Sequence, residues 1–216
     1  MKTVIWDFDG TLFDTYPGMI KALQATLSDY GTQDSDAHAL LLAIKIDSMK
    51  KVFDDYAREH QVDRKELQRV YNGYELELNA DPKPYPGAGE SLQAVHAAGG
   101  MNLLWTHRDQ KAWRLLQRYG WKDLFAGGTT IDMHFKRKPD PESINFLLNK
   151  FNLQAADTLV VGDRYLDVAA GTAAGCNTLY LNVDGLNAAP AATWHADSLL
   201  EAEPLVRAFV TEQFKK

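Results

Sequence analysis

Residues 3–12 read Thr-Val-Ile-Trp-Asp-Phe-Asp-Gly-Thr-Leu, an apolar run that passes directly into two acidic residues. The run is partly β-branched and is stopped by Gly10, so it predicts a short buried strand. Gly10 lets the backbone turn sharply, and the N–H groups that follow can face an anion. A turn with helix-capping aspartates is the alternative for Asp7 and Asp9. Because a strand that runs straight into two acids and Gly-Thr is unusual, the stretch favours a ligand site at the strand's C-terminal end.

Apolar runs of the same kind recur later in the chain. They cover residues 101–106, 158–162 and 177–182, and a weaker one covers 129–133. Helical patterns lie between them, because apolar residues share one face from Ala112 to Tyr119 and from Ile144 to Phe151. Near-continuous apolar runs are typical of central strands covered on both faces, and their alternation with helices indicates βαβ units. The predicted fold class is therefore α/β with a mostly parallel sheet.

Residues 16–80 break this alternation. Their apolar residues follow the helical period in four segments, at 19–30, 37–46, 49–56 and 67–78, and no convincing strand lies among them. The stretch ends at residues 81–87, Asp-Pro-Lys-Pro-Tyr-Pro-Gly, which predict a rigid, turn-rich linker. We therefore expect an all-helical insertion at 16–80, with a core formed by 1–15 and 81–216. Without the insertion the chain has the length of one ordinary domain of about 150 residues.

The composition of the 216 residues limits the class of protein. With 45% hydrophobic and 24% charged residues, the chain is globular rather than disordered. Its 23 basic and 29 acidic residues give a net charge of −6, which argues against binding to nucleic acid or an anionic membrane. Cys176 is the single cysteine, which excludes an intrachain disulfide and a zinc site made of several cysteines.

The hydropathy pattern offers no membrane segment. The sequence has no run of about 18 apolar residues, so no membrane span is expected. Asp7 and Asp9 interrupt the first apolar stretch, which therefore lacks the shape of a signal peptide. A cytoplasmic location is the expectation that follows by default.

Three further polar clusters lie at the ends of predicted strands, where open parallel sheets bind ligands. Thr106 closes one strand, and its hydroxyl can bond a phosphate oxygen, although such a threonine alone is a weak signal. Lys138, fixed before a proline and just ahead of a helix, can neutralise a phosphate, and Lys136 competes for that role. Asp163 and Asp167 follow a buried strand, and a helix that begins near Asp163 puts both carboxylates on one face. The alternative is an N-capping Asp163 with a surface Asp167.

Together the clusters resemble the motifs of the haloacid dehalogenase (HAD) superfamily of aspartate-nucleophile phosphohydrolases. The matching segments are Asp7-x-Asp-Gly-Thr-Leu12, Lys138-Pro-Asp-Pro141 and Gly162-Asp-x-x-x-Asp167. The resemblance covers the whole chain, and the helical insertion matches the cap that one branch carries after its first motif. Residues 85–88, Tyr-Pro-Gly-Ala, resemble the re-entry segment of phosphoglycolate-phosphatase-like members. The resemblance implies a Rossmann-like parallel sheet core with an inserted all-helical cap domain that closes over the substrate.

The resemblance also implies a role for each acid of the motifs. Asp7 is expected to be the nucleophile that forms an aspartyl-phosphate. Asp9 is expected to protonate the leaving oxygen and then to activate water, and dehalogenating relatives lack this second acid. Mg²⁺ is the implied cofactor, with Asp7, the backbone carbonyl of Asp9, and Asp163 as its ligands.

Other motif positions are expected to hold the phosphate. By resemblance these are Gly10, Thr11, Thr106 and Lys138, with Lys138 neutralising charge in the transition state. Asp167 is expected to orient Lys138 or a metal-bound water.

Two residues depart from the family pattern, and each leaves two interpretations open. His107 follows Thr106 where many relatives have asparagine. It either bonds the substrate or Asp7, or it is a solvent-facing residue at a helix start. Arg164 stands where smaller residues are common, and it either binds a substrate anion or forms a surface ion pair.

The expected function is a Mg²⁺-dependent phosphatase, a phosphoric monoester hydrolase that acts on a small phosphorylated metabolite. A phosphomutase of the β-phosphoglucomutase type uses the same residues and is the nearest alternative. A phospho-aspartate signalling protein, or a binding protein without turnover, is the alternative from another class. The expected partner is the small metabolite, with neither nucleic acid nor membrane involved, and the oligomeric state is left open.

Overall fold

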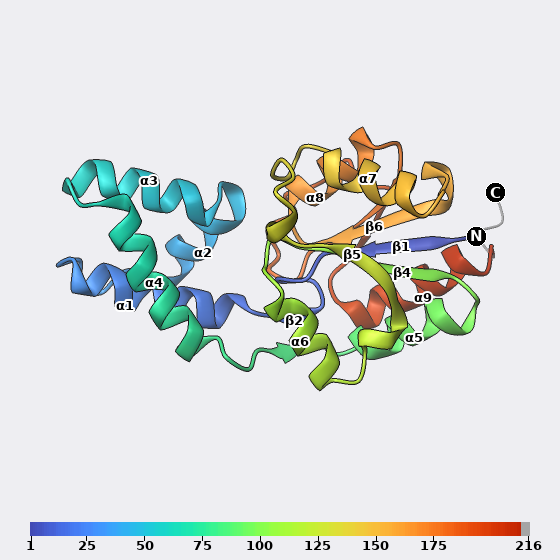
Figure 1. Cartoon of the computed structure of the whole chain (residues 1–216), viewed down its shortest axis with the longest axis horizontal. Helices are drawn as coiled ribbons and strands as arrows, with labels where there is room; N and C mark the ends of the chain where they lie inside the picture. Colours follow the sequence, from blue (N-terminus) through green and yellow to red (C-terminus); the bar gives the residue numbers. More distant parts are fainter. Residues whose placement is uncertain (213–216) are drawn as a thin grey trace. The chain divides into compact units, whose positions relative to one another are not determined.

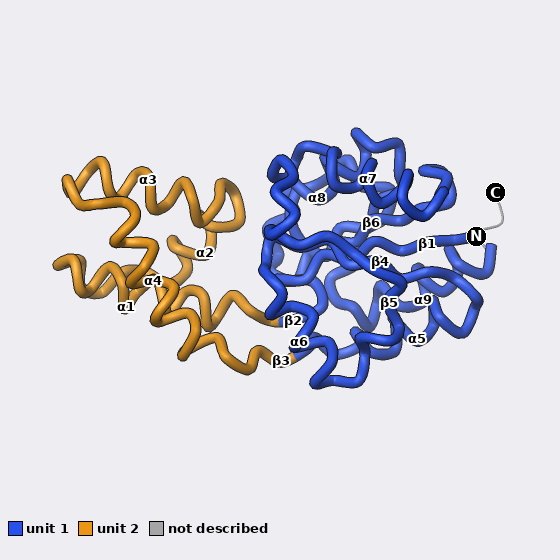
Figure 2. The backbone as a smooth tube through the Cα atoms, viewed as in Figure 1, with its two compact units in different colours: residues 1–13, 84–216 blue, residues 14–83 orange. Residues whose placement is uncertain are grey.

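The computed structural model describes residues 1–212, and the chain divides into two compact units (Figure 2). One unit combines residues 1–13 with the chain from 84 onward, and the other is formed by residues 14–83. The helical unit is thus a few residues longer at each end than the expected 16–80. The chain passes between the units through the short strands β2 (Phe13–Asp14) and β3 (Lys83–Pro84), which pair with each other.

The core unit is built on a six-stranded sheet whose neighbouring strands all run parallel. Its strands, in the spatial order β5-β4-β1-β6-β7-β8, are β5 (Phe125–Thr129), β4 (Met101–Trp105), β1 (Thr3–Trp6), β6 (Thr158–Gly162), β7 (Asn177–Leu181) and β8 (Trp194–Ala196). The predicted α/β class with a parallel sheet is confirmed. Trp6 pairs with Leu104 on one side and with Val161 on the other, so the central strands end at one edge.

Helices cover both faces of this sheet, with α7 and α8 on one side and α5 and α9 on the other (Figure 1). The helices of the core are α5 (Ala88–Ala97), α6 (Lys111–Arg118), α7 (Glu142–Lys150), α8 (Tyr165–Ala173) and α9 (Leu199–Val210). Side chains of β1 alternate between the faces because a strand has a period of two. Val4 and Trp6 pack in one apolar cluster with Leu92 of α5, and Ile5 packs in another with Ile144 of α7.

Two strands differ from the sequence-based expectation. The strand expected at 129–133 lies at 125–129, and the 3₁₀ turn η2 (Ile131–Met133) follows it. The glycines of this strand weaken its apolar pattern, so hydropathy does not reveal the strand. The sheet nevertheless requires one of these glycines. A Cβ atom at Gly128 would lie 2.4 Å from the carbonyl oxygen of Leu104, so β5 approaches β4 only with glycine there. The three-residue β8 carries too little pattern to be predicted.

Residues 14–83 form a helical unit with its own apolar core. Its helices are α1 (Tyr16–Asp29), α2 (Ala37–Ile46), α3 (Met49–His60) and α4 (Arg64–Leu78). The side chains of Asp36, Ser48 and Asp63 cap the last three by accepting backbone N–H bonds. Phe53 and Tyr71 meet edge to face at 5.1 Å between ring centroids inside the buried cluster. Among residues 1–212, no helix is both long and apolar enough to cross a membrane.

Candidate active site

The loop after β1 turns back on itself and buries Asp7. The Asp7 backbone N–H donates to the Val161 carbonyl at 2.9 Å, which continues the pairing with β6 past the end of β1. Gly10 has a φ of 77°, a conformation that favours glycine, and its N–H donates to the Phe13 carbonyl at 2.9 Å. The Thr11 hydroxyl lies 3.2 Å from Asp7 Oδ2 and 3.4 Å from Asp163 Oδ1. The first motif therefore forms a tight loop that holds Asp7 next to the end of β6.

Asp163 and Asp167 lie beside Asp7 and are almost fully buried. Helix α8 begins at Tyr165 with Arg164 as its N-cap, so the alternative that Asp163 caps the helix is wrong. Asp167 is 1% exposed rather than a surface acid, and its Oδ2 accepts from the Arg164 backbone N–H at 3.0 Å. Gly162 makes room for it, because a Cβ atom there would lie 2.3 Å from the Asp167 Cβ.

Lys138 is the cation of this cluster. Its Nζ lies 2.5 Å from Asp7 Oδ1 and 2.8 Å from Asp167 Oδ1, and its side chain is 5% exposed. The ammonium also sits 3.8 Å from the centre of the Trp105 ring. Lys136, the competing candidate, is 71% exposed and pairs with Asp140 at 3.6 Å. Of the two lysines, Lys138 alone reaches the acids.

The electrostatics of the cluster leave it with an excess of negative groups. Burial, with Asp167 and Asp163 nearby, raises the pKa of Asp7 to about 8 despite the opposing effect of Lys138. Burial by itself lowers the pKa of Lys138, but Asp167 and Asp7 outweigh it and raise that pKa above its ordinary value. Lys138 thus pairs with two carboxylates, Asp7 and Asp167, while Asp163 adds a third acid near Asp7, and a further cation would relieve this crowding of acids.

The three acids also meet the geometric requirement for a metal site. One carboxylate oxygen from each of Asp7, Asp163 and Asp167 lies within 4.8 Å of the others, and all three residues are buried. Hard oxygen donors of this kind suit Mg²⁺, which is held by few carboxylates together with waters and substrate oxygens. The donor set therefore fits the implied cofactor.

Asp9 lies apart from this acidic cluster. Arg108 Nε donates to Asp9 Oδ1 at 2.5 Å, and both side chains are largely buried. The Arg108 guanidinium also lies 5.8 Å from the Phe8 ring centre. Sequence reasoning missed Arg108, which lies in the irregular loop after Thr106. Because β1 and β4 are neighbours, the two loops that follow them meet at one edge, and that adjacency is the signal that could have found the pair.

Thr106 and His107 lie at the carboxyl end of β4 but do not join the acids by hydrogen bonds. The buried Thr106 Oγ1 accepts from the Arg108 backbone N–H at 3.0 Å. His107 is half-buried, and the next helix begins only at Lys111, so His107 is not a helix-start residue facing solvent. Burial, and then Lys138, Arg137 and Arg164, lower the pKa of His107 to about 2, which leaves a neutral imidazole.

Comparison with known proteins agrees with this arrangement. The family model for haloacid dehalogenase-like hydrolases matches residues 4–181. A phosphoglycolate phosphatase of Aliivibrio fischeri is 27% identical over 100% of this chain and 94% of its own. An N-acetylmuramic acid 6-phosphate phosphatase of Pseudomonas putida is 29% identical over 82% of this chain and 81% of its own.

A solved structure of a predicted phosphoglycolate phosphatase from Haemophilus somnus has a TM-score of 0.78 at 22% identity. It covers 95% of this chain and 97% of its own, and at that identity it shows the shared fold alone. The hydrolase family model and the phosphatase relatives together indicate a phosphoric monoester hydrolase. The family model matches most of the chain, and the phosphatase relatives align along it. The chain therefore belongs to the haloacid dehalogenase-like hydrolase family, in its phosphoglycolate-phosphatase-like branch.

Proposed function

We propose that the chain is a Mg²⁺-dependent phosphatase that hydrolyses a small phosphorylated metabolite through an aspartyl-phosphate. One observation carries the proposal: Asp7, buried at the end of β1, contacts Lys138 at 2.5 Å within a cluster completed by Asp163 and Asp167. A buried carboxylate beside one ammonium and two further acids is suited to act as a nucleophile once a metal ion balances the charge. The relatives' substrates, phosphoglycolate and N-acetylmuramic acid 6-phosphate, are small phosphorylated compounds and support the substrate class.

The proposed reaction has two steps. An Asp7 carboxylate oxygen bonds to phosphorus, the bond to the leaving oxygen breaks, and Asp9 gives that oxygen a proton. Asp9 then takes a proton from water as the water oxygen attacks phosphorus, which releases inorganic phosphate and restores Asp7. Mg²⁺, held by Asp7, Asp163 and the backbone carbonyl of Asp9, supplies charge neutralisation when it is bound.

The remaining proposed roles belong to other residues of the motifs and of the loops beside them. Lys138 lowers the pKa of Asp7 through their direct contact and holds a phosphate oxygen. Gly10, Thr11 and Thr106 line the phosphate site, and Asp167 orients Lys138 through the contact at 2.8 Å. Arg108 holds the Asp9 carboxylate in place by the bond at 2.5 Å. We also propose that residues 14–83 act as the cap of the family.

The test is release of inorganic phosphate from p-nitrophenyl phosphate, which contains no sugar acceptor. We expect turnover with Mg²⁺, less than a few per cent of it after chelation, and recovery on adding Mg²⁺ back. Phosphate release that appears only in the presence of a sugar phosphate would identify a mutase instead. A stable phosphorylated protein that never turns over would support the signalling alternative and contradict the proposal.

Replacing Asp9 by asparagine separates acid–base chemistry from metal binding. The amide oxygen that this change introduces can still accept from Arg108 and the backbone carbonyl is unchanged, so we expect Asp9→Asn to bind Mg²⁺ as the wild type does. Loss of the proton donor should lower kcat by about 10²–10⁴-fold. The loss should be larger for phenyl phosphate than for 2,4-dinitrophenyl phosphate, whose leaving oxygen needs little protonation. An equal loss on both substrates would argue against Asp9 as the acid.

A further inference from the structure

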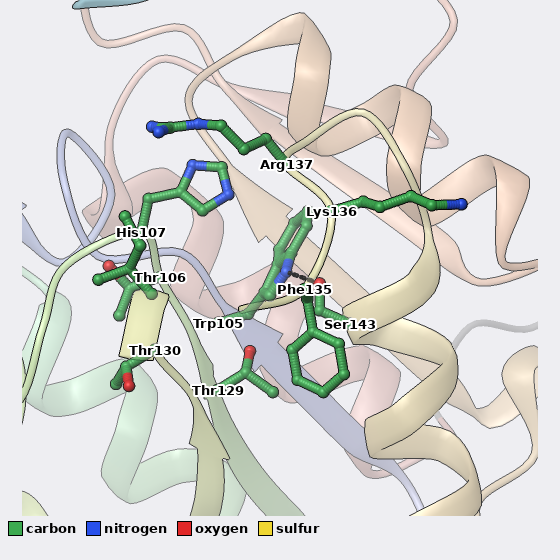
Figure 3. A pocket seen from close by; sticks show the side chains of 10 residues that line it. Trp105, Thr106, His107, Thr129, Thr130, Phe135, Lys136, Arg137 and Ser143 are labelled. Atoms are coloured by element: carbon green, nitrogen blue, oxygen red, sulfur yellow. Dashed lines mark hydrogen bonds between the residues drawn. The ribbon is translucent and has the colours of Figure 1, made fainter. Parts of the chain in front are cut away.

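Trp105 closes strand β4 beside the acidic cluster, and its ring is held in one orientation. Its indole N–H donates to the Ser143 hydroxyl in the first turn of α7 at 2.6 Å (Figure 3). Both residues are buried, and the ring packs in one apolar cluster with Ile144 and Leu147 of the same helix. A buried indole whose single donor is satisfied has little freedom to turn. Helix α7 therefore fixes the direction in which the face of the ring points.

That face lies against the ammonium of Lys138. Nζ is 3.8 Å from the ring centre, and the Trp105 carbonyl oxygen accepts from the same Nζ at 3.4 Å. Asp7 and Asp167 contact the same ammonium at 2.5 Å and 2.8 Å. The face of a tryptophan ring attracts a cation more strongly than other aromatic faces do, and most strongly where water is excluded. Because the Lys138 side chain is only 5% exposed, this contact belongs to the stronger kind.

The contact with the ring has a property that the carboxylates lack. In the proposed reaction Asp7 forms a bond to phosphorus, so the charge on its oxygens changes from one step to the next. The attraction between Lys138 and Asp7 changes with it, whereas Asp167 keeps drawing the ammonium to its own side. The Trp105 ring forms and breaks no bond, and its attraction for the ammonium does not depend on the state of Asp7. The ring thus limits how far Nζ moves while the charge on Asp7 changes.

We propose that Trp105 is a positioning residue of the phosphoryl transfer, which acts through Lys138. Its indole face holds the ammonium next to the Asp7 carboxylate and the phosphate oxygen that Lys138 binds, and Ser143 fixes the plane of the indole. A group misplaced by about 1 Å can cost about 10²-fold in rate, so a contact that fixes Nζ contributes to kcat. That role rests on the proposed function and adds to it two residues outside the three matching motif segments.

A near-isosteric change in the ring tests the electrostatic part of this role. Chains grown with 5-fluorotryptophan keep the shape of all five tryptophans, but fluorine withdraws electron density from the ring face and weakens its attraction for a cation. With p-nitrophenyl phosphate and saturating Mg²⁺, the labelled wild type should have a kcat lower by about two- to fivefold. Labelled Trp105→Phe should have the kcat of unlabelled Trp105→Phe. No decrease in the labelled wild type, or the same decrease in both chains, would overturn the inference.

Substitutions measure how much the aromatic face contributes. Trp105→Leu keeps an apolar side chain without a ring, and kcat for p-nitrophenyl phosphate should fall by about 10–30-fold with KM changed by less than about threefold. Trp105→Phe restores a ring and should lose less than about fivefold. Ser143→Ala, which leaves the indole N–H without its partner, should lower kcat by about two- to fivefold. Trp194→Leu is the matched control, because it makes the same change in the edge strand β8 and should leave kcat unchanged.

A measurement that requires no turnover checks the contact itself. In fluorine NMR of the labelled protein, the Trp105 resonance is the one that Trp105→Phe lacks. Lys138→Met should shift this resonance because the charge at the ring face is removed, and Lys136→Met, which removes an exposed lysine of the same loop, should leave it in place. An unmoved resonance in Lys138→Met, or equal losses of kcat in Trp105→Leu and Trp105→Phe, would overturn the positioning role. Wild-type protein that fails to hydrolyse p-nitrophenyl phosphate would instead overturn the proposed function.

Discussion

Asp7→Asn is expected to abolish hydrolysis of p-nitrophenyl phosphate while leaving the protein at least as stable as the wild type. The amide has no anionic oxygen to attack phosphorus, so kcat should fall by about 10⁴–10⁶-fold, as it does when other enzymes lose a nucleophile. The measurement is phosphate release at saturating Mg²⁺ and substrate. Isolation of an acid-stable, base-labile phosphoprotein from the wild type, but not from the variant, would identify the phosphorylated residue.

The stability expectation follows from the electrostatics at Asp7. Its pKa of about 8 in the folded protein, against 3.8 ordinarily, means that folding favours the protonated form. At neutral pH the Asp7 carboxyl is ionised in the unfolded chain, whereas the folded protein favours its protonated form. Folding must therefore bind a proton or bury the anion, and either costs stability above the unfolded pKa. The neutral amide avoids this cost, and Lys138 keeps its contact with Asp167.

Asp123→Asn is the matched control, because it makes the same chemical change at an exposed position in the core unit. It should alter neither turnover nor the thermal midpoint. If Asp7→Asn retained turnover, or if it unfolded the protein, the assignment of Asp7 as a buried nucleophile would fail.

The sequence predicts those strands and helices that have a clear hydropathy pattern. Strand β1, its neighbours β4 and β6, and the next strand β7 are nearly continuous apolar runs, and helices such as α7 show one apolar face. The pattern places strand β5 four residues too late because its third and fourth residues are glycines, and Gly128 is required by contact with the Leu104 carbonyl rather than by hydropathy. A requirement set by a neighbouring strand is invisible in a single segment.

The candidate site shows the same division. Strand ends that carry acids locate Asp7, Asp163 and Asp167, and the structure brings these three side chains together. Residues in loops without a regular period could not be assigned to the site, because their partners are set by contacts in the folded structure. Arg108 meets Asp9 from a different strand end, and Trp105, which hydropathy assigns to the core, meets Lys138 through its ring.

Lys138→Met should be the most destabilising of the substitutions considered, as well as inactive. The ammonium is buried and contacts Asp7 and Asp167 together, so its loss leaves several buried carboxylates without their cation. Removing one partner from a buried pair costs about 3–5 kcal/mol. For a chain of this size that corresponds to a thermal midpoint lower by about 6–20 °C. Urea unfolding followed by circular dichroism measures the free-energy difference directly.

The pH dependence of the stability lost in Lys138→Met distinguishes an electrostatic cause from a packing defect. Lys138 is the group that lowers the pKa of Asp7, so its removal moves that pKa further above about 8. Wild type and variant bear the same cost of the raised Asp7 pKa up to about pH 8, where Asp7 of the wild type ionises, and only the variant's cost grows above that pH. The variant's deficit should therefore change little between pH 5 and pH 7.5 and grow by up to about 1.4 kcal/mol per pH unit above pH 8.

Lys136→Met is the control, because it removes a lysine of the same loop whose side chain is 71% exposed. It should lose less than about 0.5 kcal/mol at pH 7.5 or pH 9, since exposed ion pairs contribute little. A Lys138→Met deficit that is equal at pH 7.5 and pH 9 would mean that the side chain stabilises the core by packing over Trp105 alone. In that case Lys138 would no longer explain how three buried acids are tolerated at one end of the sheet.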